Sequence, residues 1–354
     1  MFRTIGRWLF RLFVFSILAL ITIGTFLFID YKKFLSTPMV LTDSPKTFTV
    51  QSGDNISKLI KSFDERGLPL AQKSPFSKAL GGYYFRYLAK SRHQSNQLKI
   101  GEYPLYKGMT PIDMLDTLTS GKTIAYTVRF GEGWTFKQLR AELQKNPNID
   151  HTLLFVPDKD IMSALKLGNG KTAYEGQFFP DTYQFPSHTK DSEILKQAYH
   201  LMQKNLDKAW QARDKSIKLK SPYELLILAS IIEKETGVND EREKISGVFH
   251  RRLAKGMPLQ TDPTVIYGMG DRYKGTIYRS DLKRDTPYNT YTRTGLPPTP
   301  IASPSLASLM AAGQPDKGTS LYFVANGKGG HTFTDSYKEH LKAVKIYRQQ
   351  LKSK

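Results

Sequence analysis

An uncharged apolar run near the amino terminus limits the possible architectures of this chain more than any other feature. It extends from Leu12 to Ile29, eighteen residues dominated by Leu, Ile and Phe. A helix of this length can cross the hydrocarbon core of a bilayer, at the lower end of the usual range. A cleaved signal peptide would have a shorter apolar core and an A-x-A-like site after it, whereas Asp30, Tyr31 and two lysines follow here. We therefore expect an uncleaved transmembrane anchor over residues 12–29.

Basic residues beside the anchor predict its orientation. Arg3, Arg7 and Arg11 precede the span and favour a cytoplasmic amino terminus over residues 1–11, although two lysines just beyond the span weaken the asymmetry. After a linker over residues 30–45, roughly 320 residues remain, which is enough for two domains with their own cores. We expect a single-pass protein of the plasma (inner) membrane whose bulk lies in the periplasm or otherwise outside the cytoplasm.

Charge and composition narrow the class of partners. The formal net charge is +20 and the pI is near 9.7, which implies an anionic neighbourhood such as phospholipid headgroups or an acidic polymer, or a solvated basic face. The extracytoplasmic location makes nucleic acid the least favoured anion, so we expect no nucleic-acid partner. The chain has no cysteine, and its seven histidines are scattered without an H-E-x-x-H motif. We therefore expect no metal and no cofactor.

The segment after the anchor has the pattern of a small α/β module. Thr47 to Val50 reads as a strand, the next four residues as a turn, and Ile56, Leu59 and Ile60 as the apolar face of a helix. A second strand-to-helix passage ends at Gly121. We expect a module over residues 46–125, with an insertion at 61–97.

The clearest chemical signal is a helix whose end carries two acids. Leu225 to Gly237 reads L-L-I-L-A-S-I-I-E-K-E-T-G, with a capping box expected at its start and Gly237 as its stop. At 100° per residue, Glu233 and Glu235 point to nearly opposite sides. They cannot flank one bond as the two carboxylates of an ordinary glycosidase do, about 5 to 9.5 Å apart. Either one glutamate carries the chemistry, or both acids are ion-paired or solvated.

Later segments predict a mixed domain with loops suited to sugar. We expect a helix over about 240–254, a short helix over 306–313, a hairpin around Gly327 to Gly330 and a basic terminal helix from Ser336 on. Together with the module, this predicts an α+β fold: a transmembrane helix, a small α/β module, a larger mixed domain over 126–345 and a basic tail over 346–354. Candidate sugar-binding residues lie in proline-broken or aromatic loops: Glu175, Gln260, Thr261, Asp262, Tyr288 and Asn289.

Several motifs in one order resemble the MltG (YceG-like) family of endolytic murein transglycosylases. They are A-S-I-I-E-K-E-T-G from Ala229, G-M-P-L-Q-T-D-P-T-V-I-Y-G from Gly256, Y-N-T-Y-x-x-x-G-L-P-P from Tyr288, G-K-G-G-H-x-F from Gly327 and E-G-x-F-F-P-D-T-Y from Glu175. Residues 48 to 60 also resemble the opening of a LysM domain, a module that binds N-acetylglucosamine polymers. An ordinary strand, turn and helix gives the same pattern.

The family resemblance implies cleavage of the β-1,4 bond between N-acetylmuramic acid and N-acetylglucosamine within a strand, leaving a 1,6-anhydromuramyl end. One carboxylic acid suffices, acting first as acid and then as base. By the first acid of E-K-E-T we expect Glu233 to be catalytic. Gln260, Thr261 and Asp262 would hold acetamido groups or hydroxyls, and Tyr288 and Asn289 would orient the glutamate or stack on a ring.

Two alternatives remain open, and the expected partners follow from the resemblance. A hydrolytic muramidase would need a second carboxylate, first of all Asp262 or Glu175, and a non-enzymatic scaffold would only bind peptidoglycan. The expected partners are peptidoglycan strands, the bilayer through residues 12–29, and peptidoglycan synthases. Because the anchor keeps the site near the membrane, we expect action on nascent strands, which would terminate their elongation.

Overall fold

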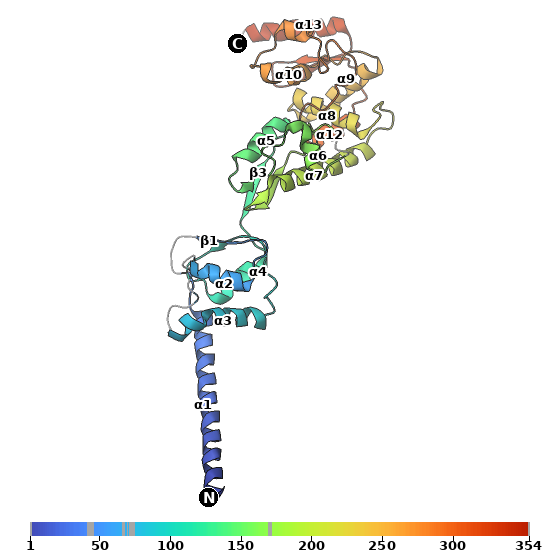
Figure 1. Ribbon diagram of the computed structural model, residues 1–354. Helices are drawn as coiled ribbons and strands as arrows, with labels where there is room; N and C mark the ends of the chain where they lie inside the picture. The colour runs from blue at the N-terminus through green and yellow to red at the C-terminus, as the bar shows by residue number, and fades with distance from the viewer. Residues whose placement is uncertain are drawn as a thin grey trace. The chain divides into compact units, whose positions relative to one another are not determined.

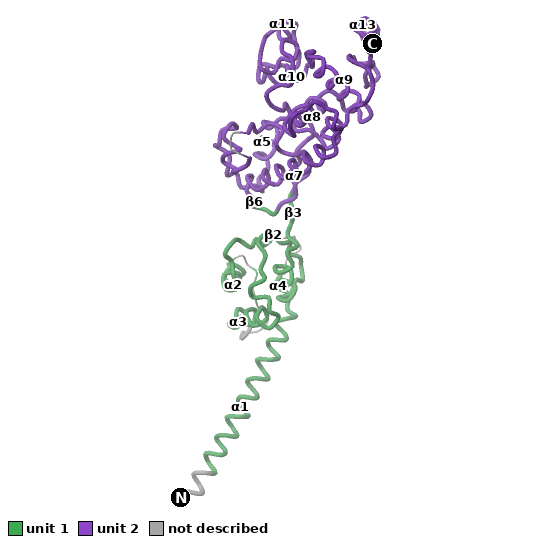
Figure 2. Tube along the Cα trace, turned by 90° about the vertical axis from the view of Figure 1, so that its right-hand side faces the viewer, with its two compact units in different colours: residues 1–126, 186–188 green, residues 127–185, 189–354 purple. Residues whose placement is uncertain are grey.

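The protein divides into two compact units. The computed structural model describes residues 2–40, 46–65, 68, 70, 75–168 and 172–352 (Figure 1). Unit 1 comprises residues 1–126 and 186–188, and unit 2 comprises residues 127–185 and 189–354 (Figure 2). The expected mixed α+β class is confirmed, because helices dominate and the strands form small two-stranded sheets.

Helix α1, Phe2–Ser36, contains the apolar run and continues beyond it. By length and composition it can cross a membrane, a criterion that a signal sequence also meets. Its last turns belong to unit 1: Phe34 is buried among the core side chains, and Tyr84 Oη donates to Asp30 Oδ2 at 3.0 Å. Residues 30–36, which were expected in a linker, are helical, and the burial of Phe34 in the core of unit 1 stabilises this end of the helix. Residues 41–45 of that linker lie outside the described residues.

Unit 1 is a two-stranded sheet covered by helices. Its elements after α1 are β1 (Lys46–Val50), α2 (Ile56–Glu65), α3 (Pro75–Ser91), β2 (Gly101–Leu105) and α4 (Pro111–Ser120). β1 and β2 are antiparallel, with Phe48 opposite Tyr103. The Phe48 ring lies 5.0 Å from that of Phe63 in α2, which in turn lies 5.4 Å from Phe85 in α3. The expected insertion at 61–97 thus supplies part of the core through Phe63 and Phe85, while Tyr83 and Tyr87 of α3 are exposed.

Unit 2 contains the remaining helices and most of the remaining strand residues, and β3 and β5 each have their end residues in unit 1. The amino-terminal part has β3 (Ala125–Arg129) paired with β5 (Thr182–Pro186), β4 (Ile149–Asp150) paired with β6 (Thr189–Lys190), and α5 (Phe136–Lys145), α6 (Ile161–Ala164) and α7 (Asp191–Gln211). The rest has α8 (Pro222–Glu235), α9 (Arg242–Ala254), α10 (Asp262–Met269), α11 (Arg279–Lys283), α12 (Leu306–Gly313), the hairpin β7 (Tyr322–Ala325) and β8 (His331–Thr334), and α13 (Tyr337–Lys352).

Helix α8 is the core helix of unit 2. Every residue from Leu225 to Ile232 is buried, and the helix packs against α7, α9, α10 and α12. Ser221 caps its start, with Glu224 N donating to the Ser221 hydroxyl at 3.2 Å. The second half of the expected capping box is absent, because the Glu224 carboxylate accepts from Lys220 N instead. α8 ends at Glu235, with Thr236 extended, so the expected stop at Gly237 lies beyond the true end.

The sequence predicted the types of the carboxyl-terminal elements correctly, namely a hairpin followed by a helix. β7 and β8 pair antiparallel, with Tyr322 opposite Thr334, as expected of a hairpin. The terminal helix α13 continues to Lys352, so the described part of the expected basic tail is helical. Residues 353–354 lie outside the described residues.

Candidate active site

The last turn of α8 directs three charged side chains to three places. Glu233 reaches the start of α12, Lys234 lines one cavity, and Glu235 lines another. This divergence follows from the 100° step between consecutive helical residues. The sequence prediction that the two glutamates cannot face one substrate agrees with these contacts.

One carboxylate oxygen of Glu233 is held by the amino terminus of α12. Its Oε2 accepts hydrogen bonds from Ser305 N at 3.0 Å, Ser305 Oγ at 2.5 Å and Ser308 Oγ at 2.6 Å. Three donors on one oxygen, at the start of a helix, hold this side chain in place. The carboxylate therefore joins α8 to α12, and the same oxygen has no position left for a substrate.

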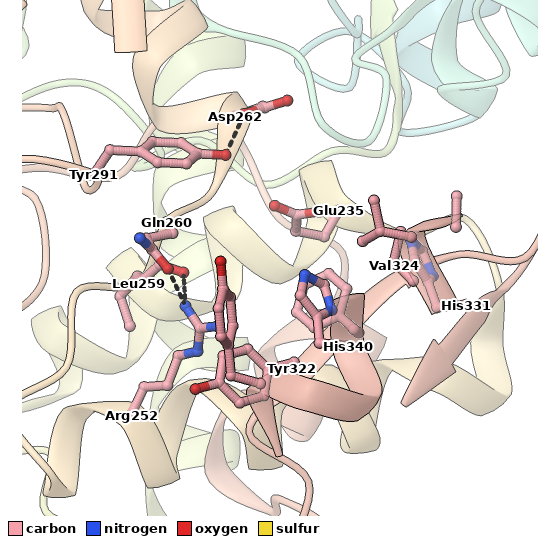
Figure 3. Close-up of a pocket in the computed structure, with 14 residues that line it drawn as sticks. Glu235, Arg252, Leu259, Gln260, Asp262, Tyr291, Tyr322, Val324, His331 and His340 are labelled. Atoms are coloured by element: carbon pink, nitrogen blue, oxygen red, sulfur yellow. Dashed lines mark hydrogen bonds between the residues drawn. The ribbon is translucent and has the colours of Figure 1, made fainter. Parts of the chain in front are cut away.

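Glu235 lies on the wall of a cavity of about 380 Å³, the Glu235 cavity (Figure 3). Around it, the loop before α10 supplies Gln260 and the first turn of α10 supplies Asp262. The loop after α11 supplies Tyr291, and the hairpin supplies Tyr322 and His331. These residues come from segments nearly a hundred positions apart in the chain. Carboxyl, amide, phenol and imidazole groups around an open space are the lining expected of a site that binds polar rings.

Burial raises the pKa of the Glu235 carboxyl above its ordinary value. Thr261 Oγ1 donates to its Oε1, which opposes this rise, while the nearby negative charge of Asp262 reinforces it. A neutral carboxyl at the edge of a cavity can give a proton to a bound oxygen atom. Among the described residues, Thr261 is the sole hydrogen-bond donor to this carboxyl, so the other oxygen can meet a substrate.

The loop that carries Gln260 is held in a strained conformation. Gln260 has φ of +54°, in the left-handed region that side chains with a Cβ rarely adopt. Its N–H donates to Thr290 O at 3.0 Å, and its Oε1 accepts from Arg252 Nη1 at 3.2 Å. Backbone conformations of this kind persist where neighbouring residues hold them, and they are frequent at functional sites. The contacts aim the Gln260 side chain at the cavity.

A second fixed pair forms the wall at β8. Glu241 Oε2 lies 2.7 Å from His331 Nδ1, and Glu241 Oε1 accepts from His331 N at 2.8 Å. The carboxylate fixes Nδ1 as the protonated nitrogen, which leaves Nε2 for another partner. On the opposite wall, Tyr291 Oη donates to Asp262 Oδ1 at 2.6 Å. Both pairs orient polar groups without using their full hydrogen-bonding capacity.

Of the other site residues predicted from the sequence, some line a different cavity and one has a structural role. Glu175 and Tyr288 line a separate cavity of about 780 Å³, the Glu175 cavity. Asn289 is buried, and its Nδ2 donates to the carbonyl oxygens of Asp281, Leu282 and Arg284, so it holds a loop together. Of the candidates, the Glu235 cavity brings together Gln260 and Asp262, with Thr261 behind them.

Sequence reasoning passed over several residues of the Glu235 cavity. Tyr291 and His331 stand in motifs that carry the family resemblance, although the sequence alone favours a hairpin role for His331. Arg252, in the helix before the loop of Gln260, is buried, and its guanidinium lies 5.0 Å from the Tyr322 ring centroid. For Tyr291 and His331, the available signal in the sequence was their place in these motifs. That all three residues line one cavity can be seen only in the folded structure.

Comparisons with known proteins agree with these motifs. The YceG-like family model matches residues 48–346, across both units, and no separate LysM domain is identified. An endolytic murein transglycosylase of Bacillus subtilis (strain 168) is 34% identical over 341 residues, covering 92% of this chain and 90% of that protein. One of Streptococcus pneumoniae (D39) is 26% identical and covers 91% of this chain, but the chain spans 62% of that protein's length.

A solved structure is also similar. The yceG-like protein lmo1499 from Listeria monocytogenes is 29% identical, with a TM-score of 0.51, covering 85% of this chain and 99% of that one. The family match spans most of the chain, and the Bacillus relative exceeds 30% identity over nearly its whole length. This chain belongs to the YceG-like family.

Proposed function

We propose that this protein is a membrane-anchored lytic transglycosylase that cleaves peptidoglycan strands internally, with Glu235 as its acid and base. The observation that carries the proposal is the carboxyl of Glu235 on the wall of an open, polar cavity, with a pKa raised by burial. The names of the Bacillus and Streptococcus relatives support the substrate class. The cleaved bond is the β-1,4 bond between N-acetylmuramic acid and N-acetylglucosamine.

The reaction needs one carboxyl in two roles. Neutral Glu235 gives its proton to the glycosidic oxygen as the bond from that oxygen to muramic C1 breaks. The resulting carboxylate takes the proton of the muramic C6 hydroxyl, whose oxygen bonds to C1. The products are a 1,6-anhydro end and a free hydroxyl on the leaving sugar, and no water is consumed. Glu235 ends as it began.

The contacts support Glu235 as the catalytic acid. The family motif had suggested Glu233, the first acid of E-K-E-T. An acid must reach the leaving oxygen and hold a proton at working pH. Glu233 instead accepts three hydrogen bonds with one oxygen at the start of α12. We therefore assign Glu233 the role of a positioning residue, which holds α8 against α12.

Other residues of the Glu235 cavity would bind and orient sugar. Gln260 and His331 offer groups for acetamido and hydroxyl substituents, and Thr261 holds the catalytic carboxyl. Asp262 lies in the same cavity and is the carboxylate that could activate water in a hydrolytic muramidase. That reaction is the second candidate, and the products distinguish it.

The anchor and the first module suggest where the enzyme works. A cleaved signal sequence would take α1 away, yet Asp30 and Phe34 of α1 are buried in unit 1. This supports an uncleaved anchor in the plasma (inner) membrane, with the amino terminus cytoplasmic and the catalytic unit outside. The enzyme would act on nascent strands beside peptidoglycan synthases and terminate their elongation. The LysM-like module would add glycan binding.

Mass spectrometry of digested sacculi tests the proposal. Full-length wild-type protein in detergent should release fragments with 1,6-anhydromuramyl ends, which are lighter by one water than hydrolytic products. Reducing muramic ends would favour the muramidase, and glycan binding without new ends would favour a non-enzymatic scaffold. Either result would overturn the transglycosylase proposal.

A further inference from the structure

The Glu175 cavity is the larger of the two spaces beside the end of α8. It has a volume of about 780 Å³, against about 380 Å³ for the Glu235 cavity. Four tyrosines line it, namely Tyr174, Tyr267, Tyr273 and Tyr288. The reaction at Glu235 uses none of these rings, so the cavity has no role in the chemistry described above.

The two cavities adjoin at two pairs of consecutive residues. Lys234 lines the Glu175 cavity and Glu235 the other, and Pro263 lines the Glu175 cavity while Asp262 lines the other. Consecutive Cα atoms lie about 3.8 Å apart. A polymer bound across Glu235 therefore has the Glu175 cavity within the length of a neighbouring unit.

Charged groups of the Glu175 cavity have partners within the protein. Lys137 Nζ lies 2.6 Å from Asp271 Oδ1, and Lys234 Nζ donates to Gly133 O at 3.2 Å. Asp158 pairs with Arg140 outside the lining. Lys137 and Asp158 therefore have counter-ions, whereas Lys234 keeps its positive charge, because its partner is a neutral carbonyl oxygen.

Glu175 has a positioning role in this cavity. Only 4% of it is exposed, and it accepts hydrogen bonds from Phe136 N at 2.9 Å and Tyr267 Oη at 3.1 Å. The Tyr267 ring meets the Tyr288 ring edge to face, with centroids 4.9 Å apart. The buried carboxyl thus fixes one ring, which fixes the next. Rigid aromatic rings in a concave site suit ring-shaped, uncharged ligands.

We propose that the Glu175 cavity binds an uncharged N-acetylhexosamine ring of the glycan strand, next to the bond cleaved at Glu235. This rests on the proposed function for the identity of the polymer. The tyrosine rings contact the sugar face, and Lys234 can donate to a hydroxyl or acetamido oxygen at the edge of the ring.

Fluorine NMR can observe this cavity alone. Full-length Glu235→Gln protein in detergent, labelled with 3-fluorotyrosine, is titrated with a tetramer of N-acetylglucosamine. The Tyr273 resonance, assigned by its absence in Tyr273→Ala, should shift on binding. The Tyr278 resonance is the matched control, because Tyr278 is exposed and lines none of the cavities described here. Filling the cavity with Ile266→Trp should abolish the Tyr273 shift.

Kinetics supply a second readout. In otherwise wild-type protein, Tyr273→Ala should raise KM for glycan strands about tenfold, as expected for one lost aromatic contact, and Tyr278→Ala should leave it unchanged. The inference is overturned if the tetramer leaves the Tyr273 resonance in place, or if a free stem peptide shifts it and the tetramer does not. If wild-type protein forms no anhydro ends, the proposed function fails, while the titration still decides whether the cavity binds sugar.

Discussion

Three neighbouring residues of α8 meet three different electrostatic environments. Glu233 lies at a helix amino terminus among hydrogen-bond donors, Lys234 donates to the carbonyl oxygen of Gly133, and Glu235 lies at the edge of a cavity. Their chemistry differs because their surroundings differ, although two of them are the same amino acid. Assigning roles to such residues depends on contacts from segments far away in the sequence.

The hydrogen bond from Thr261 to Glu235 should set part of the pH dependence of cleavage. Because the acid must be protonated, kcat/KM should fall as pH rises through the raised pKa of Glu235. Thr261→Val removes a bond that lowers this pKa, so the falling limb should move to higher pH. A pH–rate profile checks it. Thr292→Val, an exposed position outside the cavity, should leave the limb in place; an unmoved limb in Thr261→Val would contradict the assignment.

Glu175 should make stability depend on pH. Burial raises its pKa from 4.5 to about 7, so between these values the folded protein holds a proton that the unfolded chain has lost. The free energy of unfolding should therefore fall as pH rises through this window, by at most roughly 3 kcal/mol. Chemical denaturation between pH 5 and pH 8 should show this slope in wild type and a smaller slope in Glu175→Gln. Glu193→Gln, at an exposed position, should keep the wild-type slope, and an equal slope in Glu175→Gln would refute the account.

Polar side chains also connect helices, and the contact between α8 and α12 is the clearest case. Ser305 caps α12 by accepting from Ser308 N at 3.3 Å, and the same hydroxyl donates to Glu233. One serine therefore completes a helix end and binds the neighbouring helix. The position of α12 against the core of unit 2 depends on this shared hydrogen bond.

Removing the Ser305 hydroxyl should destabilise unit 2. Ser305→Ala should lower the free energy of unfolding by about 1 kcal/mol, the usual value of a helix cap. Because Glu233→Gln weakens the same network, the double variant should lose less than the two single losses combined. Urea unfolding of the four proteins measures the coupling, and strict additivity would show that the two residues act separately.

Local patterns predicted the elements of this fold better than their ends and contacts. Apolar periodicity predicted α8, and the hairpin and terminal helix were also foreseen, because each signal lies within a few turns of chain. The 100° rule separated Glu233 from Glu235, but it could not assign them. Ser305, which donates hydrogen bonds to Glu233, lies 72 positions away in the sequence, and no local pattern can predict such a contact.

At the scale of the whole molecule, α1 combines an exposed apolar stretch with a contribution to the core of unit 1. Its apolar part can cross a bilayer, and its last turns complete the core of unit 1 through Phe34 and Asp30. The apolar stretch and part of the first folded unit thus belong to one continuous helix.

Truncation should reveal this double role. Removing residues 1–29 should give a protein that is soluble without detergent and keeps a cooperatively unfolding unit 1. Removing residues 1–36 should also delete Phe34, whose loss from a core costs about 3 to 5 kcal/mol. Thermal unfolding compares the two, and equal stabilities would mean that the end of α1 does not support unit 1.

The most direct test of the central claim compares the two glutamates of α8 in one assay. Sacculi are digested with full-length wild-type, Glu233→Gln and Glu235→Gln proteins, and 1,6-anhydromuramyl ends are counted by mass spectrometry, with folding checked by circular dichroism. We predict that Glu235→Gln folds and forms no such ends, whereas Glu233→Gln is less stable but still forms them. Anhydro ends from Glu235→Gln, or their loss in a folded Glu233→Gln alone, would contradict the account.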